Sequence, residues 1–289
     1  MIVDDAGNPV QSGTGVPVLT PQQEQEAEDR TSVSAVVVHE AIRKDGEEEL
    51  RRSASALAWS GLAAGLSMGF SFLGEALFHA YLPNAPWRPL LTSLGYPLGF
   101  LIVIIGRQQL FTENTLTAII PLLARRNLST LVSVLRLWAI VLVANLVGAH
   151  LFAWVIGHTP LLGSEFNSSL NQLAEKAADV TFGTAVLRGI FAGWLIAMVV
   201  WMLAAIDSAH IPIIIILTYF VGLANLTHIV AGSVEVLFLV MIGAKSWWAF
   251  AGGYMIPSLI GNIIGGVSLV SALNHAQVIA GAKKTGQAA

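Results

Sequence analysis

Two short stretches decide the fold predicted for this chain: Ala-Asn-Leu-Val-Gly-Ala at residues 144–149 and Gly-Asn-Ile-Ile-Gly-Gly at residues 261–266. Both read small-Asn-apolar-apolar-Gly-small, and they lie 117 residues apart, which indicates an internal repeat. Small residues at such spacing let helix backbones approach closely in a membrane. We therefore expect four residues to serve helix packing: Asn145, Gly148, Asn262 and Gly265.

The rest of the chain has the composition of a membrane protein. Of its 289 residues, 55% are hydrophobic and only 11% are charged, whereas soluble domains have about 25% charged residues. Residues 1–52 carry 16 of the 33 charged side chains, so the remainder is poor in charge. The absence of cysteine excludes disulfides and thiolate chemistry. A net charge of −3 without a basic patch argues against a nucleic-acid partner.

Six apolar stretches are each long enough to cross the hydrocarbon core of a bilayer, which takes about 20 helical residues. They cover residues 54–80, 94–121, 129–156, 182–206, 211–242 and 247–273. Because each half of the repeat contains three spans, the two halves enter the lipid bilayer from opposite sides. The predicted fold class is an all-α membrane protein with six transmembrane helices, arranged as two inverted three-helix repeats.

The predicted domain organisation has four parts. These are a disordered polar leader (1–31), an N-terminal surface helix (32–52), a six-span transmembrane transporter domain (53–280) and a short tail (281–289). An even number of spans places both termini on one side, and the surplus of Lys and Arg there predicts that this side is the cytoplasm. The surface helix is either a solvated charged helix or a gate at the cytoplasmic mouth of a pore.

Polar side chains interrupt the second and fifth spans. Residues 106–115, Gly-Arg-Gln-Gln-Leu-Phe-Thr-Glu-Asn-Thr, lie in the second span, and residues 222–235 of the fifth contain Asn225, Thr227 and His228. Unpaired polar groups cost several kcal/mol in hydrocarbon, so both runs must face protein or a water-filled cavity. We predict that both helices are broken inside the membrane. For the second span, the alternative is a loop outside the membrane between two short helices.

His228 is the strongest functional candidate. It lies 34 residues before Asn262, and Thr112 lies 33 residues before Asn145, so Thr112 and His228 are expected at equivalent positions of the two halves. A lone buried histidine is often a satisfied core residue, but an ionisable residue inside a span is a functional candidate by default. Histidine changes its charge near neutral pH and could donate a hydrogen bond or a proton to a small anion.

Several other charged side chains fall within the predicted spans: Glu75, Arg107, Glu113, Arg136, Arg188 and Glu235. Glu113 or Glu235 could pair with Arg107 or Arg188 for structural reasons. Alternatively, the two arginines attract anions at a pore mouth.

Motifs of nucleotide-binding proteins, serine hydrolases, zinc proteases and dinucleotide enzymes are absent. The chain is therefore not predicted to be an enzyme, and no cofactor and no metal site are predicted.

Together these features resemble the formate/nitrite transporter family over about residues 32–275. The resemblance rests on Leu110-Phe111-Thr112 in a broken second span, on His228 in a broken fifth span and on the two Asn-Gly stretches. It implies an aquaporin-like protomer with its own pore, and a homopentamer in the inner membrane. It also implies passage of small monovalent anions such as formate or nitrite.

The resemblance further implies roles for individual residues. Residues 110–112 would form one hydrophobic constriction, and Phe220 or Val221 would contribute to a second near His228. The anion would be held or protonated at His228, between the two constrictions. The predicted function is therefore proton-coupled transport of a small monovalent anion, with Asn225 and Thr227 also at the pore.

The chain departs from the family pattern at three positions. Thr227 stands where the formate channels usually have Glu, and Gly193 and Gly232 stand where they have Asn. These changes remove polar groups from around the predicted site and leave the substrate open. Two other functions are compatible with the same fold: a facilitator of neutral solutes such as water, glycerol or ammonia, and a membrane sensor or scaffold. The first alternative lacks the Asn-Pro-Ala motif that would support it.

Overall fold

The structure, a computed structural model, describes residues 20–22 and 33–284. The chain divides into two units, residues 1–34 and residues 35–289, and the second unit contains the membrane helices. The predicted disordered leader, 1–31, lies almost wholly outside the described residues, and so does the end of the predicted tail, 285–289.

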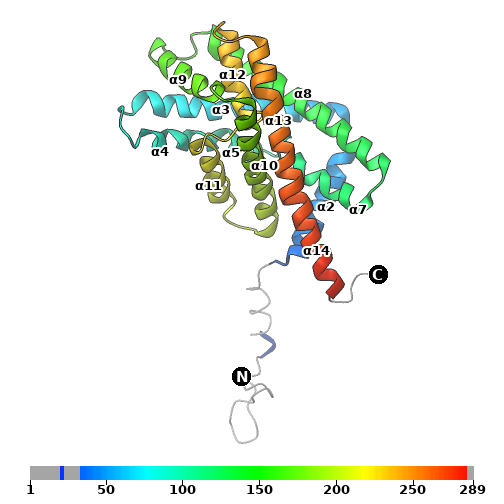
Figure 1. The fold of residues 1–289 in the computed structure, drawn as a ribbon. Helices are drawn as coiled ribbons and strands as arrows, with labels where there is room; N and C mark the ends of the chain where they lie inside the picture. The colour runs from blue at the N-terminus through cyan, green and yellow to red at the C-terminus, as the bar shows by residue number, and fades with distance from the viewer. Residues whose placement is uncertain (1–19, 23–32, 285–289) are drawn as a thin grey trace, which may run out of the picture. The chain divides into compact units, whose positions relative to one another are not determined.

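Helices are the only regular secondary structure among the described residues of the second unit (Figure 1). Its α-helices are α2 (Ala35–Arg51), α3 (Ala54–Tyr81), α4 (Arg88–Thr92), α5 (Pro97–Ile105), α6 (Asn114–Thr117), α7 (Ile119–Arg125), α8 (Leu128–His158), α9 (Asn167–Ala178), α10 (Phe182–Ala205), α11 (His210–Leu223), α12 (Ala231–Met241), α13 (Ile256–Ile263) and α14 (Leu273–Lys284). Short 3-10 helices are η1 (Ser93–Gly95) and η2 (Ser164–Phe166), and the π-helical stretches are η3 (Ala249–Met255) and η4 (Ile264–Ala272).

Five helical stretches of the described residues are long and apolar enough to cross a membrane. They are Ala54–Tyr81, Arg88–Ile105, Leu128–His158, Phe182–Ala205 and Ala249–Gly281. The remaining predicted span, 211–242, is divided into α11 and α12, each of which is shorter than a full crossing. The predicted all-helical membrane fold is therefore confirmed, with a break between α11 and α12 and another after α5.

The boundaries of the second span differ from the prediction. Its long helical part runs over Arg88–Ile105 and not from residue 94, while residues 106–121 form a loop followed by α6 and the start of α7. Two prolines near helix starts, Pro89 and Pro97, explain the early beginning, since proline is favoured in the first helical turn.

Helix packing repeats in the two halves. α3 lies along α8, and α10 lies along α13 and η4, as Figure 1 shows for α10 and α13. A Cβ on Gly65 of α3 would overlap the backbone of Asn145, and a Cβ on Gly193 of α10 would overlap the backbone of Asn262. On the facing helices, Gly148 and Gly265 are just as closely approached by backbone. The glycines thus bring each pair of helices into direct backbone contact, and each asparagine can donate a hydrogen bond to the facing helix, Asn145 to Gly61 and Asn262 to Gly189.

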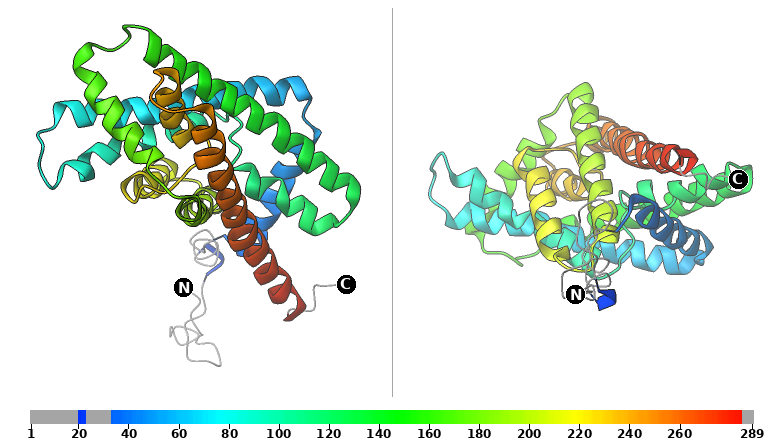
Figure 2. Two further views of the ribbon diagram at one scale, coloured as in Figure 1. Left: turned by 45° about the horizontal axis from the view of Figure 1, so that its top comes forward. Right: turned by 90° about the horizontal axis from the view of Figure 1, so that it is seen from below.

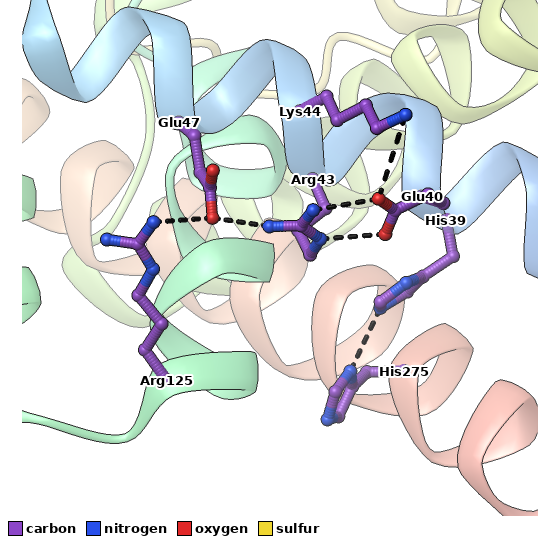
Figure 3. A network of polar contacts seen from close by, with 7 residues as sticks. All are labelled: His39, Glu40, Arg43, Lys44, Glu47, Arg125 and His275. Atoms are coloured by element: carbon purple, nitrogen blue, oxygen red, sulfur yellow. Dashed lines mark hydrogen bonds and ion pairs between the residues drawn. The ribbon is translucent and has the colours of Figure 1, made fainter.

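The last four elements, η3, α13, η4 and α14, form one continuous helix (Figure 2). Near its end, His275 meets the N-terminal helix α2: the Nε2 of His39 and the Nδ1 of His275 are 2.9 Å apart (Figure 3). On the next turns of α2, Arg43 bridges Glu40 and Glu47, and Glu47 also forms a 2.7 Å ion pair with Arg125 of α7.

The other face of α2 is apolar. Val38 and Ile42 are buried in a cluster that includes Leu116 of α6 and Ile120 of α7. One face of the helix is therefore docked against the segment that follows the first break, while its charged face bears Glu40, Arg43 and Glu47. A gating role for α2 stays a prediction.

Candidate functional site

The two broken helices end in the same way. After α5, Arg107 has a positive φ of 53°, and after α11, Asn225 has a positive φ of 49°. In each turn an amide reaches back five residues along the chain: Gln108 N donates to the Val103 carbonyl at 2.9 Å, and Leu226 N donates to Val221 at 3.0 Å. This is the Schellman pattern of helix ends, which favours Gly or Asn at the left-handed position. Asn225 fits that preference and Arg107 does not.

Each loop beyond these turns is held by one asparagine. The Oδ1 of Asn145 accepts from Phe111 N at 2.9 Å, while its Nδ2 donates to the carbonyls of Gln109 at 2.9 Å and Gly61 at 2.7 Å. The side chain is completely buried and thus pairs three backbone groups that water cannot reach.

Asn262 makes the same three bonds in the other half. Its Oδ1 accepts from Ile229 N at 2.8 Å, and its Nδ2 donates to Thr227 and Gly189, both at 2.9 Å. We predicted a packing role for the two asparagines. Their side chains also fix the loops through direct hydrogen bonds, and the loops then carry the candidate pore residues.

The hydrogen bonds correct the predicted register of the two halves. Asn145 holds the residues on either side of Leu110, and Asn262 holds the residues on either side of His228. Leu110 is therefore the counterpart of His228, and the prediction that Thr112 is its counterpart is wrong. Thr112 lies two residues further along its loop and reaches across to the other half.

His228 joins the two loops. Its Nε2 lies 2.8 Å from the Oγ1 of Thr112, and its Nδ1 accepts from the backbone amides of Val230 at 3.3 Å and Ala231 at 3.1 Å. The ring is completely buried and stands edge-to-face against Phe100, with centroids 5.1 Å apart. Two amide donors at Nδ1 leave only Nε2 to carry the hydrogen of the neutral ring.

This arrangement fixes the direction of the hydrogen bond between the halves. Nε2–H of His228 donates to Thr112, so the hydroxyl hydrogen of Thr112 is left to donate, and no acceptor for it is found among the described residues. A second proton on Nδ1 would face two N–H groups. The geometry therefore favours hydrogen-bond donation by His228 over proton transfer, the two roles that the sequence left open.

Apolar side chains surround the pair on the side of the first loop. Leu110 and Phe111 are buried, and the Phe111 ring stacks edge-on against Trp138 at 5.5 Å. Of the two residues considered for a second constriction, Val221 is buried whereas Phe220 is 55% exposed on the outer face of α11. Of the two, only Val221 lines the cavity described next, so the structure favours Val221 over Phe220.

A cavity beside α9 lies next to the second loop. It is lined by Glu75, Tyr96, Leu173, Lys176, Ala177, Arg188, Val221, Gly222, Asn225, Leu226, Thr227, Gly232, Glu235 and Tyr254. We call it the α9-side cavity. It brings together four predicted site residues, Asn225, Thr227, Arg188 and Glu235, and the hydroxyl of Thr227 already donates to the Ala185 carbonyl at 2.6 Å.

Other candidates lie elsewhere. Arg107 is exposed at the first break, and Glu113 is half-buried just before α6. The expected ion pairs of Glu113 or Glu235 with Arg107 or Arg188 do not form anywhere in the described part of the chain. Arg107 and Glu113 stand near opposite ends of the loop after α5, whereas Arg188 lies on α10 and Glu235 on α12.

Sequence reasoning gave no site role to Glu75, Lys176, Tyr96 or Tyr254. Glu75 could have been singled out as a charged residue inside a predicted span. Lys176 could not, because it lies in the polar segment between two predicted spans. No group of three potential metal ligands exists within residues 20–22 and 33–284.

Two of the family departures have a structural explanation. A Cβ at Gly232 would overlap the hydroxyl of Tyr254, which donates to the His228 carbonyl at 3.4 Å. A Cβ at Gly193 would overlap the Asn262 backbone. In this chain a larger residue at 232 would displace Tyr254 from the cavity, and one at 193 would separate α10 from α13.

Known proteins share this architecture. Residues 36–276 match the family described as "Formate/nitrite transporter". The chain is 42% identical over 251 residues to the inner membrane protein YfdC of Escherichia coli, covering 87% of this chain and 81% of that one. It is 25% identical over 244 residues to the formate channel BtFdhC of Bacillus thuringiensis, covering 81% and 91% of the two chains.

Solved structures agree with the fold. A pentameric formate channel with formate bound superposes with a TM-score of 0.64 at 20% identity, covering 82% of this chain and 99% of that chain. An ion channel of the same family gives a TM-score of 0.67 at 19% identity. With the family match extending over most of its length, the chain belongs to the formate/nitrite transporter family.

Proposed function

We propose that this chain passes small monovalent anions such as formate or nitrite, together with a proton, through a pore within each protomer. Membership of the family and the formate channels among the relatives support the substrate class. A homopentamer is proposed from the pentameric relative of the same fold. The basic residues beside α2 support an inner-membrane orientation with both termini in the cytoplasm.

The observation that carries the proposal is the hydrogen bond between His228 and Thr112. It joins the two Asn-held loops in the buried centre of the protein. The hydroxyl of Thr112, polarised by the imidazole N–H, is left to donate to an anion. Hydrogen bonds in such a chain strengthen one another.

The surroundings of the pair favour passage as a neutral acid. Leu110 and Phe111 present apolar surface, and moving an isolated ion into a low-dielectric medium costs of order tens of kcal/mol in the Born limit. An anion that gains a proton avoids this cost. His228 then acts as a fixed, neutral donor, and the proton comes from another group.

The test is formate uptake into proteoliposomes with and without an inward proton gradient, for the wild type and for His228→Ala. We expect uptake that the gradient stimulates and that the substitution reduces at least about tenfold, since hydrogen bonds to charged groups contribute about 1.5–3 kcal/mol. Uptake that follows voltage and ignores pH would contradict proton coupling. Glycerol or water flux without anion flux would favour the neutral-solute facilitator.

The role of His228 is tested by the ¹⁵N chemical shifts of its ring in labelled protein. We expect Nε2–H and unprotonated Nδ1 at all pH values that support transport. An imidazolium signal that increases as transport increases would show that His228 carries the proton.

A further inference from the structure

Two buried carboxylates face the α9-side cavity without a partner. Glu75 from α3 and Glu235 from α12 are each 8% exposed, and both line the cavity. Neither has a hydrogen bond or an ion pair with any described residue. Buried carboxylates are normally paired, so two unpaired ones on one cavity require an explanation.

The charged groups around the pair come from several elements. Lys176 of α9 and Arg188 of α10 line the same cavity, and so do the hydroxyl-bearing Tyr96 and Tyr254. Neither cation forms an ion pair with Glu75 or Glu235 among the described residues. Glu75 and Glu235 line this one cavity from α3 and α12, two helices that pack against each other.

The cavity is next to the candidate pore site. Thr227, which directly precedes His228, lines it, and Tyr254 spans from the cavity to the His228 carbonyl at 3.4 Å. Gly232, one turn before Glu235 on α12, leaves the space that Tyr254 occupies. An anion in this cavity would therefore lie between the carboxylates and the second loop.

We propose that Glu75 and Glu235 are a carboxyl pair that holds one proton and gives it to the anion in the α9-side cavity. Two like charges on one buried cavity are favourable only when a proton is shared between them. In the step, the O–H bond of the protonated carboxyl breaks and an O–H bond forms on the anion, which continues as a neutral acid. The carboxylate left behind regains a proton from the aqueous phase on that side.

The inference rests on the proposed function and supplies the proton that His228 is poorly placed to carry. It also gives the cavity its specificity. A permanent anion that cannot be protonated would be repelled by the pair, whereas the conjugate base of a weak acid would be accepted. Lys176 and Arg188 offset part of the negative charge while the anion enters.

The test uses the full-length protein with Glu75→Gln and Glu235→Gln, and Glu175→Gln as the matched control. Glu175 lies on α9 beside Lys176 but pairs with Lys245 at 3.1 Å, outside the cavity lining. The measurements are formate flux at a series of external pH values and proton uptake reported by a pH dye inside the vesicles. Each pair variant should lower acid-stimulated flux at least about tenfold, because a positioned proton donor contributes roughly 10²–10⁴-fold. The control should match the wild type.

A second measurement does not depend on transport. The infrared C=O band of protonated carboxyl groups at neutral pH should be weaker in both pair variants than in the wild type and unchanged in Glu175→Gln. Glu235→Asp, which keeps the carboxyl group, should retain the band if Glu235→Gln fails to assemble. If the band behaves as expected but the wild type passes no anion, the proton site stands and the proposed function fails. If flux occurs and both pair variants keep the wild-type pH profile, the inference is overturned.

Discussion

The loop after α5, residues 106–113, and the loop after α11, residues 224–230, share a backbone and differ in one decisive side chain. Both have a left-handed residue at their second position, both are held by three hydrogen bonds from an asparagine, and their positions correspond at a spacing of 118 residues. At the centre of the first loop is Leu110, and at the centre of the second is His228. The repeat thus builds the scaffold twice and places a polar centre in only one half.

The comparison extends to the residues after the loops. Asn114, at the position that corresponds to Gly232, donates to the Leu110 carbonyl and to Gln109. Gly232 has no side chain, and Tyr254 fills the space. The surface helices also correspond: α2 precedes α3 and packs on α7, while α9 precedes α10 and packs on α12. The two halves therefore correspond in their loops and in their surface helices. The candidate pore chemistry lies at the positions where their side chains differ.

The largest expected effect comes from removing a loop-holding asparagine. Asn262→Leu leaves the Ile229 amide and two carbonyls unpaired in a buried site, and each unpaired group costs about 1–3 kcal/mol. We expect loss of most folded protein, and the same for Asn145→Leu. The measurement is thermal unfolding in detergent. Asn127→Ala, which removes only the cap of α8 at Thr130 N, is the control and should cost about 1 kcal/mol. If either leucine variant melted like the wild type, the shared scaffold would be refuted.

The second effect removes the difference between the loops. His228→Leu gives the second loop the central residue of the first, and it should reduce formate flux about 10- to 100-fold through loss of the hydrogen-bond donor. Leu110→Met changes the corresponding position conservatively and should alter flux little. The measurement is uptake of isotope-labelled formate by assembled protein. Equal fluxes for His228→Leu and Leu110→Met would contradict the difference between the two loops.

A third, smaller effect concerns Gly232. Gly232→Ala places a Cβ on the Tyr254 hydroxyl and should destabilise the protein by about 1–3 kcal/mol. Adding Tyr254→Phe removes the hydroxyl and should restore part of that stability. Ala at the corresponding position, Asn114→Ala, cannot be rescued in this way because no tyrosine occupies that space. If the change in melting temperature of the double variant equalled the sum of the changes in the two single variants, contact between residue 232 and the Tyr254 hydroxyl would be contradicted.

The smallest effect distinguishes α2 from α9. Burial and the neighbouring His275 hold the pKa of His39 below its usual value of 6.5, against the opposing charge of Glu40. The docked helix favours neutral His39, so docking is strongest above pH 6.5 and weakens as the pH falls from there toward the lowered pKa. The change is at most about 1.4 kcal/mol per pH unit within that window. Hydrogen exchange of the α2 amides, corrected for the intrinsic rate, should rise in mild acid relative to α9. With His39→Phe the acid response of α2 should be smaller than in the wild type.

Sequence alone predicted the spans, the repeat and both breaks, because each leaves a local pattern: apolar length, the Asn-Gly spacing and polar residues inside a span. It failed on which residues of the two loops correspond, because it matched Thr112 with His228. The number of residues between a loop residue and an asparagine does not show which backbone groups the asparagine side chain bonds. The ion pairs were wrong for a related reason. Charge type alone suggests pairs of Glu113 or Glu235 with Arg107 or Arg188, but Arg188 lies on α10, Glu235 on α12, and the other two at separate ends of one loop.

The α9-side cavity could not be predicted. Glu75 and Glu235 are 160 residues apart in sequence and meet only because α3 and α12 pack together. Likewise, the tautomer of His228 follows from two backbone amides whose direction depends on the start of α12. Such contacts belong to the tertiary structure and leave no periodic signal.

The most direct test compares formate uptake by Thr112→Val and Thr218→Val under an inward proton gradient. Both threonines are completely buried, but Thr112 bonds His228 across the two loops whereas Thr218 donates to the Ile214 carbonyl within α11. Loss of the Thr112 hydroxyl should lower uptake at least about tenfold with intact assembly, while loss of the Thr218 hydroxyl should leave it near the wild type. Equal uptake by the two variants would contradict a role for the Thr112–His228 pair in anion passage.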